Sequence, residues 1–321
     1  MSDFGFSSTA DDVLAGKDLS GRTVLVTGGY SGLCQETARA MAAKGAHVIL
    51  SGRDATKLSA AADEIAEQTG AKIDTLVADL ASLASIRAAG KEARDRFSHI
   101  DILINNAGVM AAPLGRTEDG FETQFGTNHL GHFQLTKELM PLIEKGERQR
   151  IVNLSSRGHH FGGVDFDDPN YEHREYDKWR SYGQSKTANI LFTRGLEDRF
   201  GGKGIHAYAV HPGGIQTNLG RHMTEQDREW MMSRIRKMAE ESPGGQPQGF
   251  KTIPQGAATS TWAATAEELE GKGGVYCEDC HVAEESDDNP TGGVRSYALD
   301  KDKADRLWAL SEKLIGESFA V

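Results

Sequence analysis

Short apolar runs alternate with longer amphipathic segments along most of this chain. The runs predict buried strands over residues 22–27, 46–50, 72–77, 101–105, 150–154 and 205–210, with a further strand beginning at 275–277. The segments between them have helical spacing and predict helices over 31–44, 57–68, 82–97 and 182–200, and a long helix or a helix pair over 121–145. Strands that alternate with helices of this length indicate a parallel sheet with helices on both faces. We therefore expect an α/β fold, a single doubly wound (Rossmann) domain whose parallel sheet has about seven strands.

Two stretches interrupt this alternation. Residues 159–179 are polar and aromatic, and residues 219–254 contain a charged, Met-rich helix (225–241) followed by a Pro/Gly/Gln loop. Long segments at the carboxyl edge of a parallel sheet usually cover a ligand crevice, so we expect a substrate lid around 219–254. Its methionines fit ordinary core packing equally well. We expect residues 1–20 to be an acidic surface extension and 21–321 to be the dinucleotide-binding and catalytic domain.

The composition narrows the class of partner. The 321 residues carry a net charge of −11 and have no Lys/Arg-rich run, which argues against a nucleic-acid partner. No apolar run reaches the ~18 residues that a membrane span requires, and the N-terminus lacks the basic and apolar regions of a signal peptide. Three cysteines, an odd and low count, are typical of a reducing compartment. We expect a cytoplasmic protein without a disulfide framework.

A glycine turn between the first strand and the first helix predicts a nucleotide site. Gly28, Gly29 and Gly32 permit a tight turn and a close backbone approach, so that helix N–H groups can meet a pyrophosphate. The alternative is a plain strand-to-helix turn. The turn residues that we expect at the cofactor are Gly28, Tyr30, Ser31, Gly32 and Leu33.

The end of the second strand bears on the choice of cofactor. NAD enzymes often carry an acid there for the adenosine ribose, whereas this chain has Ser51-Gly52-Arg53. A small residue followed by an arginine suits a 2′-phosphate, which favours NADP(H) and leaves NAD(H) as the alternative if Arg53 is merely solvated. Asp79, after the third strand, is a candidate acceptor for the adenine amino group, or else part of a helix cap.

Tyr182 and Lys186 are four residues apart and share one face of a helix, with Cβ atoms about 5–6 Å apart. At that distance an ammonium favours tyrosinate and is expected to lower a pKa that starts near ~10. The phenol then becomes a proton donor and acceptor near neutral pH. Beside a nucleotide site, this pair suggests proton transfer coupled to hydride transfer. Tyrosine–lysine pairs at this spacing are common, so the other motifs carry much of the weight.

These pieces, in this order, resemble the short-chain dehydrogenase/reductase family. The matching elements are Thr27-Gly-Gly-Tyr-Ser-Gly32, Asp79-Leu80, Asn105-Asn-Ala-Gly108, Asn128, Ser155-Ser156, Tyr182-x-x-x-Lys186 and His211-Pro-Gly-Gly-Ile-Gln-Thr217. Asn128-His-Leu-Gly-His-Phe133, Ser156-Arg-Gly-His-His160 and Ser185-Lys-Thr-Ala-Asn-Ile-Leu-Phe192 resemble its retinol-dehydrogenase and WW-domain-oxidoreductase branch.

The resemblance implies a role for each matching residue. Tyr182 would be the general acid/base, Lys186 would hold the nicotinamide ribose, Ser156 rather than Ser155 would polarise the substrate oxygen, and Asn128 would hold a water. The cofactor residues that it implies are Asp79 and Leu80, then Asn106, Ala107 and Gly108 beside the adenosine and ribose, and Pro212, Gly213, Ile215 and Thr217 around the nicotinamide.

The implied function is that of an NAD(P)-dependent short-chain alcohol dehydrogenase or ketoreductase. It would transfer a hydride between NADP(H) and an apolar or aromatic secondary alcohol/ketone or alcohol/aldehyde, as a homodimer or homotetramer. A catalytically weak nucleotide-binding sensor on the same fold is the alternative. One departure favours it, since the last glycine of the family's TGxxxGxG turn is here Cys34. A side chain at this position either crowds the cofactor or is accommodated by its neighbours.

The remaining cysteines and histidines carry weaker signals. Cys277-Glu-Asp-Cys280-His281 resembles a haem-attachment or half-zinc motif, but a closed zinc site needs four ligands, so we interpret it as a strand end and expect no metal. We interpret His129 and His132 as helix-packing residues, and His159 and His160 as residues that line the crevice.

Overall fold

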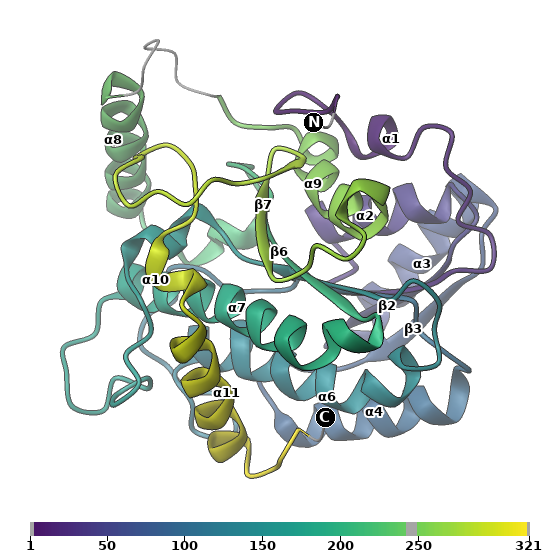
Figure 1. Cartoon of the computed structure of the whole chain (residues 1–321), viewed down its shortest axis with the longest axis horizontal. Helices are drawn as coiled ribbons and strands as arrows, with labels where there is room; N and C mark the ends of the chain where they lie inside the picture. The colour runs from purple at the N-terminus through teal and green to yellow at the C-terminus, as the bar shows by residue number, and fades with distance from the viewer. Residues whose placement is uncertain (1–2, 242–248, 320–321) are drawn as a thin grey trace.

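The computed structural model describes residues 3–241 and 249–319, and its centre is one twisted sheet between two layers of helices (Figure 1). Within these residues the sheet has eight strands in the order β3-β2-β1-β4-β5-β6-β7-β8. The strands are β1 (Thr23–Thr27), β2 (His47–Gly52), β3 (Ile73–Val77), β4 (Ile102–Asn105), β5 (Arg150–Leu154), β6 (His206–His211), β7 (Val275–Glu278) and β8 (His281–Val282). The first seven pair in parallel, and the two-residue β8 is antiparallel to β7. The expected doubly wound fold is therefore confirmed, with one short strand added.

The two helical layers follow from the alternation of side chains along the strands. Val24 and Val26 of β1 join the apolar cluster of α2 (Gly32–Ala42), α3 (Ala55–Thr69) and α9 (Ile253–Thr265). Leu25 points to the opposite face, because successive strand residues alternate. That face is covered by α4 (Leu83–Arg96), α6 (Gly131–Ile143), α7 (Lys178–Phe200) and α11 (Lys301–Ile315).

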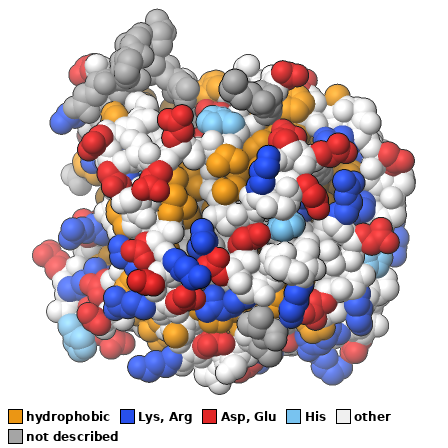
Figure 2. All heavy atoms as spheres, in the orientation of Figure 1, with side chains coloured by type: hydrophobic (Ala, Val, Ile, Leu, Met, Phe, Trp, Pro, Cys, Tyr) orange, Lys and Arg blue, Asp and Glu red, His pale blue; other side chains and the backbone are white. Residues whose placement is uncertain are grey.

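Shorter elements complete the chain. They are α1 (Ala10–Val13), α5 (Thr123–Phe125), the π-helical turn η1 (Gly126–Leu130), α8 (Glu225–Glu241), α10 (Ser296–Leu299) and the 3-10 turns η2 (Arg157–Phe161), η3 (Gly201–Lys203), η4 (Asn218–His222) and η5 (Glu267–Leu269). None of the helices within 3–241 and 249–319 is long and apolar enough to cross a bilayer. On the face drawn in Figure 2, acidic and basic side chains are mixed rather than gathered by sign.

Two expected helical segments are defined more closely by the structure. Of the long helix or helix pair expected over 121–145, the structure has the pair, α5 and α6, joined by the π turn η1. The tyrosine helix α7 begins at Lys178, four residues before Tyr182, because the Asp177 carboxylate accepts hydrogen bonds from the N–H groups of Trp179 and Arg180. This capping places a full helical turn ahead of Tyr182.

The expected surface extension, residues 1–20, is instead packed onto the domain in its middle part. Thr9 caps α1 in a capping box with Asp12. Ala10, Val13 and Leu14 are fully or almost fully buried and belong to the apolar cluster of α2 and α9. This segment packs on the domain because α1 is a one-turn amphipathic helix, and its apolar side is buried against the cluster of α2 and α9.

The expected lid lies partly outside the described residues, which omit 242–248. The described side chains of α8 are mostly exposed, and Met232 is 41% exposed, so ordinary core packing does not account for this methionine. Two contacts hold α8 on the N-terminal end of α7. Lys178 and Asp227 form an ion pair at 2.6 Å, and the rings of Trp179 and Trp230 stack at 4.8 Å.

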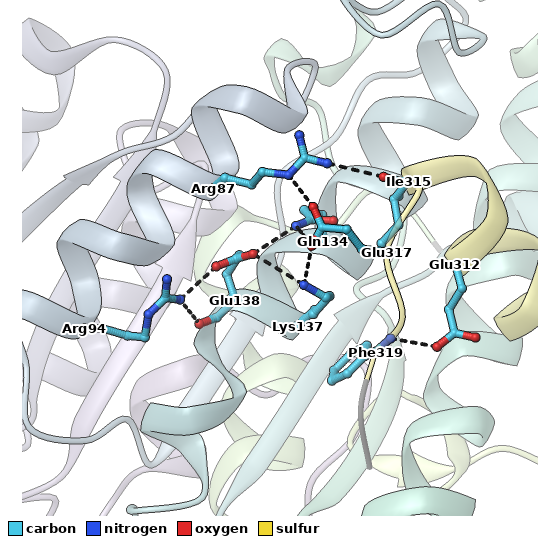
Figure 3. A network of polar contacts seen from close by, with 9 residues as sticks. All are labelled: Arg87, Arg94, Gln134, Lys137, Glu138, Glu312, Ile315, Glu317 and Phe319. Carbon is cyan, nitrogen blue, oxygen red and sulfur yellow. Dashed lines mark hydrogen bonds and ion pairs between the residues drawn. The ribbon is translucent and has the colours of Figure 1, made fainter.

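The C-terminal segment is fastened across α4 and α6 by a polar network (Figure 3). Glu317 accepts hydrogen bonds from Arg87 and Lys137, and Arg94 pairs with Glu138 at 2.8 Å. Phe319 packs against the ring of Phe133 at 5.4 Å. This network closes the apolar layer on the side of the sheet where α7 lies.

Candidate active site

The glycine turn lies at the carboxyl end of β1, where the sheet order places β2 on one side and β4 on the other. Crossovers leave in opposite directions at such a point, and ligands bind in the crevice that results. Gly28 and Gly32 have φ of +73° and +57°, which only glycine adopts readily. The N–H groups of Gly28 and Gly29 donate to the carbonyl of Ser51 and hold the turn against β2.

The start of α2 suits a pyrophosphate. Its N-cap, Ser31, makes no side-chain cap hydrogen bond, and its first turn contains no acid. The first N–H groups of an eleven-residue helix are then left without a side-chain partner, and together with the helix dipole they favour an anion. The residues present therefore fit a dinucleotide.

Cys34 faces this turn. Its Sγ accepts a hydrogen bond from Nδ2 of Asn106 at 2.5 Å, and a Cβ placed on Gly28 would lie 3.0 Å from the sulfur. Burial raises the pKa of the thiol to about 12, so the side chain stays neutral. Cys34 is thus accommodated through Asn106, and it occupies space beside the expected path of the cofactor.

Thr27 and His132 join the glycine turn to the expected catalytic region. Oγ1 of Thr27 accepts the N–H groups of Asn106 and Ala107 at 2.9 and 3.0 Å. Nε2 of His132 lies 2.9 Å from Oγ1 of Thr27, and Nδ1 of His132 lies 2.9 Å from the carbonyl oxygen of Asn128. Burial lowers the pKa of His132 to about 4, so the ring is neutral. The Asn128 carbonyl can only accept, and therefore Nδ1 of His132 carries the proton.

Asn128 lies in the π turn η1, a feature that is frequent at functional sites. Its Oδ1 accepts the N–H of Val109 at 2.8 Å, and its Nδ2 donates to the Val109 carbonyl and to Oγ of Ser185, both at 2.9 Å. A Cβ on Gly108 would lie 3.0 Å from Oδ1 of Asn128 and 3.7 Å from Nζ of Lys186. Gly108 thus permits the close approach of two expected catalytic side chains.

Ser156, Tyr182 and Lys186 meet beside the start of η2. Tyr182 is hydrogen-bonded to Ser156, and Oγ of Ser156 also accepts the N–H of Gly158 at 3.0 Å. A Cβ on Gly158 would lie only 2.6 Å from Cε1 of Tyr182, so the ring packs directly on the glycine backbone. Nζ of Lys186 donates to the carbonyl of Leu154 at 3.0 Å and lies 5.6 Å from the centroid of the Tyr182 ring.

The expected lowering of the Tyr182 pKa is wrong for this structure. Burial raises the pKa of Tyr182 to about 12, and the hydrogen bond with Ser156 opposes that rise only in part. Burial also lowers the pKa of Lys186 to about 8. Desolvation is the largest cause of both pKa shifts, so the phenol keeps its proton at neutral pH.

The expected nicotinamide loop packs against the glycine turn. A Cβ on Gly256 of α9 would lie 2.6 Å from Leu33 and 2.7 Å from Ile215, so both side chains rest on the same glycine. Thr217 lies beside Gly32, because a Cβ placed on Gly32 would be 3.6 Å from Cγ2 of Thr217. Residues separated by almost two hundred positions are thereby brought to one edge of the sheet.

Lys251 holds this loop in place, a role that no sequence pattern predicts. Its side chain is fully buried, and its Nζ lies 2.5 Å from a carboxylate oxygen of Asp279 in the β7–β8 turn. The aliphatic part of Lys251 lies against Gly213, which has φ of +100°. Its N–H donates to the carbonyl of Gly214 at 2.8 Å. No local pattern marks an isolated lysine that precedes a helix cap, so only the tertiary contacts reveal its place.

The adenosine side is more open. Arg53 is exposed after β2, and the ring of Tyr30 covers Gly52, where a Cβ would lie 2.6 Å from Cε1. Asp79 accepts the N–H of Ala81 at 2.9 Å in the turn before α4, whose N-cap is Ser82 and not Asp79. Leu80 is buried, and its carbonyl lies against Gly131.

Of the histidines with expected positions, His129 lies where we expect it and His159 does not. His129 packs among Phe125, Phe133 and Phe192, as expected. His159 does not line the crevice, because it is fully buried. Its Nδ1 meets the Ser156 carbonyl at 2.7 Å and its Nε2 accepts the N–H of Arg295.

His160 lines a hollow beside α7, together with side chains of α8, and none of the expected cofactor residues lines that hollow. The motif at Cys277 and Cys280 is a strand end and turn with two buried thiols, and burial raises the pKa of Cys280 to about 11. Across 3–241 and 249–319, no three His, Cys, Asp or Glu side chains are grouped in a way that could hold a metal ion.

Comparison with known proteins identifies the family. The family description "short chain dehydrogenase" matches residues 22–228. A short-chain dehydrogenase/reductase of Penicillium roqueforti is 39% identical over 97% of this chain and 91% of its own length. Retinol dehydrogenase 13 of Homo sapiens is 38% identical over 93% of this chain and 86% of its own. The chain belongs to the short-chain dehydrogenase/reductase family, and curated relatives include retinol dehydrogenases.

Solved structures agree on the fold. The crystal structure of an uncharacterised protein from Mycobacterium paratuberculosis is 34% identical with a TM-score of 0.73, covering 98% of this chain and all of that one. A Pseudomonas aeruginosa RhlG/NADP complex is 24% identical with a TM-score of 0.62, covering 81% of this chain and 95% of that one, and it shows a similar fold.

Proposed function

We propose that this chain transfers a hydride between NADP(H) and an apolar or aromatic secondary alcohol/ketone or alcohol/aldehyde, with Tyr182 as general acid/base. The observation that carries the proposal is the buried Tyr182 phenol, hydrogen-bonded to Ser156, with Lys186 one turn further along α7 and Asn128 across Gly108. A bound nicotinamide supplies or accepts the hydride.

Reduction needs a proton donor at the carbonyl oxygen, and Tyr182 is that donor. With a pKa of about 12, its hydroxyl is protonated at neutral pH. Oγ of Ser156 is held in place by the Gly158 N–H that it accepts, and when substrate is bound its hydroxyl donates to the same substrate oxygen. In the oxidation of an alcohol, the tyrosinate form takes the proton back.

Lys186 has two tasks in this proposal. Its ammonium stabilises the tyrosinate that is left after proton transfer. Because burial lowers its pKa to about 8, it also exchanges a proton readily near neutral pH. Asn128 is held rigidly by Val109 and Ser185, and we assign it the water that continues the proton path from Lys186.

Two further observations support the choice of cofactor and substrate. Arg53 stands exposed at the end of β2, where a guanidinium can pair with a 2′-phosphate, and this supports NADP(H). The relatives named retinol dehydrogenases are about 38% identical to this chain over most of its length, and retinol is an apolar alcohol, which supports an apolar substrate.

The test is an absorbance screen of NADPH and NADH with bulky aryl ketones and aldehydes, run on the wild type and on Tyr182→Phe. We expect NADPH-dependent turnover by the wild type and none by the variant, with cofactor affinity nearly unchanged. Cofactor binding without turnover of any carbonyl compound by the wild type would favour the sensor alternative, to which Cys34 lends some support.

A further inference from the structure

A hollow of about 630 Å³ lies between α8 and the N-terminal end of α7, and two tryptophans and a phenylalanine form its apolar wall. Trp179 and Trp230 stack at 4.8 Å with an angle of 24° between the rings. The ring of Phe161 approaches both tryptophans, at 6.1 and 5.9 Å. Trp230 remains 37% exposed, so the wall has ring surface available to a ligand.

One wall residue of the hollow, Trp179, lies on the helix that carries the proposed proton donor. Trp179, Tyr182 and Lys186 are spaced i, i+3 and i+7 along α7, which places them on one face of the helix. Phe161 packs against Gly183, the residue that follows Tyr182. A Cβ placed on Gly183 would lie 2.8 Å from Cβ of Phe161. The backbone position of Trp179 on α7 is therefore about one helical turn, roughly 5 Å along the axis, from that of Tyr182.

Two arginines at this hollow have no acidic partner within 4 Å among the described residues. Arg234 lies 5.2 Å from the ring centroids of both Phe161 and Trp230, and Arg180 follows Trp179 directly. Neither guanidinium forms an ion pair within the described residues. The carboxylates that line the hollow contact other groups.

The acids that line the same hollow do not compensate these arginines. Asp227 pairs with Lys178 at 2.6 Å and accepts from Thr224 at 2.7 Å. Asp177 accepts the N–H groups of Trp179 and Arg180 at the positive end of the α7 dipole. Burial lowers the pKa of His160 to about 4, so it adds no charge near pH 7. Among the described residues, neither acid forms an ion pair with Arg180 or Arg234, so both guanidiniums are available to a ligand.

We propose that this hollow binds the far end of the substrate and selects carbonyl compounds that carry a carboxylate on an aromatic body. The aromatic body packs on Trp230 and Phe161, and the carboxylate meets Arg234 and Arg180. A guanidinium stacked on a ring keeps its N–H edge free for a carboxylate, so one residue serves both contacts. This inference rests on the proposed function and narrows its substrate class from apolar or aromatic to aromatic and acidic.

The test uses an aryl ketone with a carboxylate at the end remote from the carbonyl, together with its methyl ester. We expect the wild type with NADPH to favour the carboxylate by at least tenfold in kcat/KM. Arg234→Gln should bring that ratio close to one, and Arg180→Gln should lower it. Arg236→Gln, on the same helix but outside the hollow, is the matched control and should keep the wild-type ratio.

Calorimetric titration of both compounds into the NADPH complex gives a readout that does not require turnover. Carboxylate-selective binding that is lost in Arg234→Gln supports the inference even if no ketone is reduced, in which case only the proposed function fails. Turnover of both compounds with equal kcat/KM, or a preference that survives both arginine variants, would overturn the inference and leave the proposed function standing.

Discussion

The ring of Tyr182 rests on the backbone of Gly158, and a Cβ at that glycine would lie 2.6 Å from Cε1 of the tyrosine. Gly158 comes two residues after Ser156, whose Oγ accepts its N–H. One glycine therefore fixes both the ring of the proposed proton donor and the hydroxyl that assists it.

Gly158→Ala should consequently lower kcat by at least about tenfold, a barrier change of ~1.4 kcal/mol, because the added methyl displaces the Tyr182 ring. Gly163→Ala is the matched control. Its Cβ would meet only Tyr297 at 3.7 Å, an ordinary contact, so it should retain near wild-type kcat. Equal kinetic effects of the two variants would contradict the contact with Tyr182 as the cause.

The pH dependence of reduction should follow Lys186. Burial lowers the pKa of its ammonium to about 8, so the charge that stabilises the tyrosinate is present below that pH and is lost above it. We expect kcat for ketone reduction to fall as the pH rises through about 8. Lys186→Arg keeps a charge to far higher pH and should remove this fall, whatever its absolute rate. A pH–rate profile that is unchanged in Lys186→Arg would show that another group titrates.

Arg53 should decide the choice between the two cofactors. Arg53→Ala is expected to weaken NADPH binding by one to two orders of magnitude, since only NADPH carries the 2′-phosphate that a guanidinium can hold. NADH binding serves as the internal control and should change by less than about twofold. Titration of cofactor fluorescence measures both affinities, and a comparable loss for NADH would mean that Arg53 acts on the fold rather than on the phosphate.

Cys34 should oppose cofactor binding through its sulfur. Its Sγ occupies the space beside Gly28 and holds Asn106, and the pyrophosphate must approach this turn closely. Cys34→Gly is expected to tighten NADPH binding by roughly fivefold, ~1 kcal/mol, with slightly lower thermal stability because glycine disfavours the helix. Cys34→Ala should give most of the gain in affinity with less loss of stability. Weaker binding in both variants would show that the contact between the sulfur and Asn106 positions the cofactor loop.

The Lys251–Asp279 pair should respond asymmetrically to the loss of each partner. Asp279→Asn leaves a fully buried ammonium without a counter-ion and should cost about 3 kcal/mol of unfolding free energy. Lys251→Met removes the charge, keeps the aliphatic contact with Gly213 and should cost clearly less. Denaturant unfolding of both single variants and the double variant checks this, and a double variant that is no more stable than Asp279→Asn would argue against an unpaired charge as the cause.

Local patterns were sufficient for much of the fold. Apolar runs located all seven parallel strands, and glycines and helical spacing located most of the helices between them, because burial on both faces of a parallel sheet leaves a strong local signal. The helices α9 and α11 were not anticipated. The sequence of α9, Ile253–Thr265, consists mainly of small residues that are buried on nearly every side, so it has little amphipathic contrast.

In the candidate site as well, some features follow from local sequence motifs and others depend on the tertiary structure. Motif order determined which residues belong to the glycine turn, to the loop at Asn106–Gly108 and to the pair Tyr182 and Lys186, since each motif is a local requirement on the backbone. Only the tertiary structure decided that burial raises the pKa of Tyr182, that Lys251 meets Asp279, and that Trp179 meets Trp230. These outcomes depend on desolvation and on contacts between segments far apart in the chain, and neither leaves a trace in local spacing.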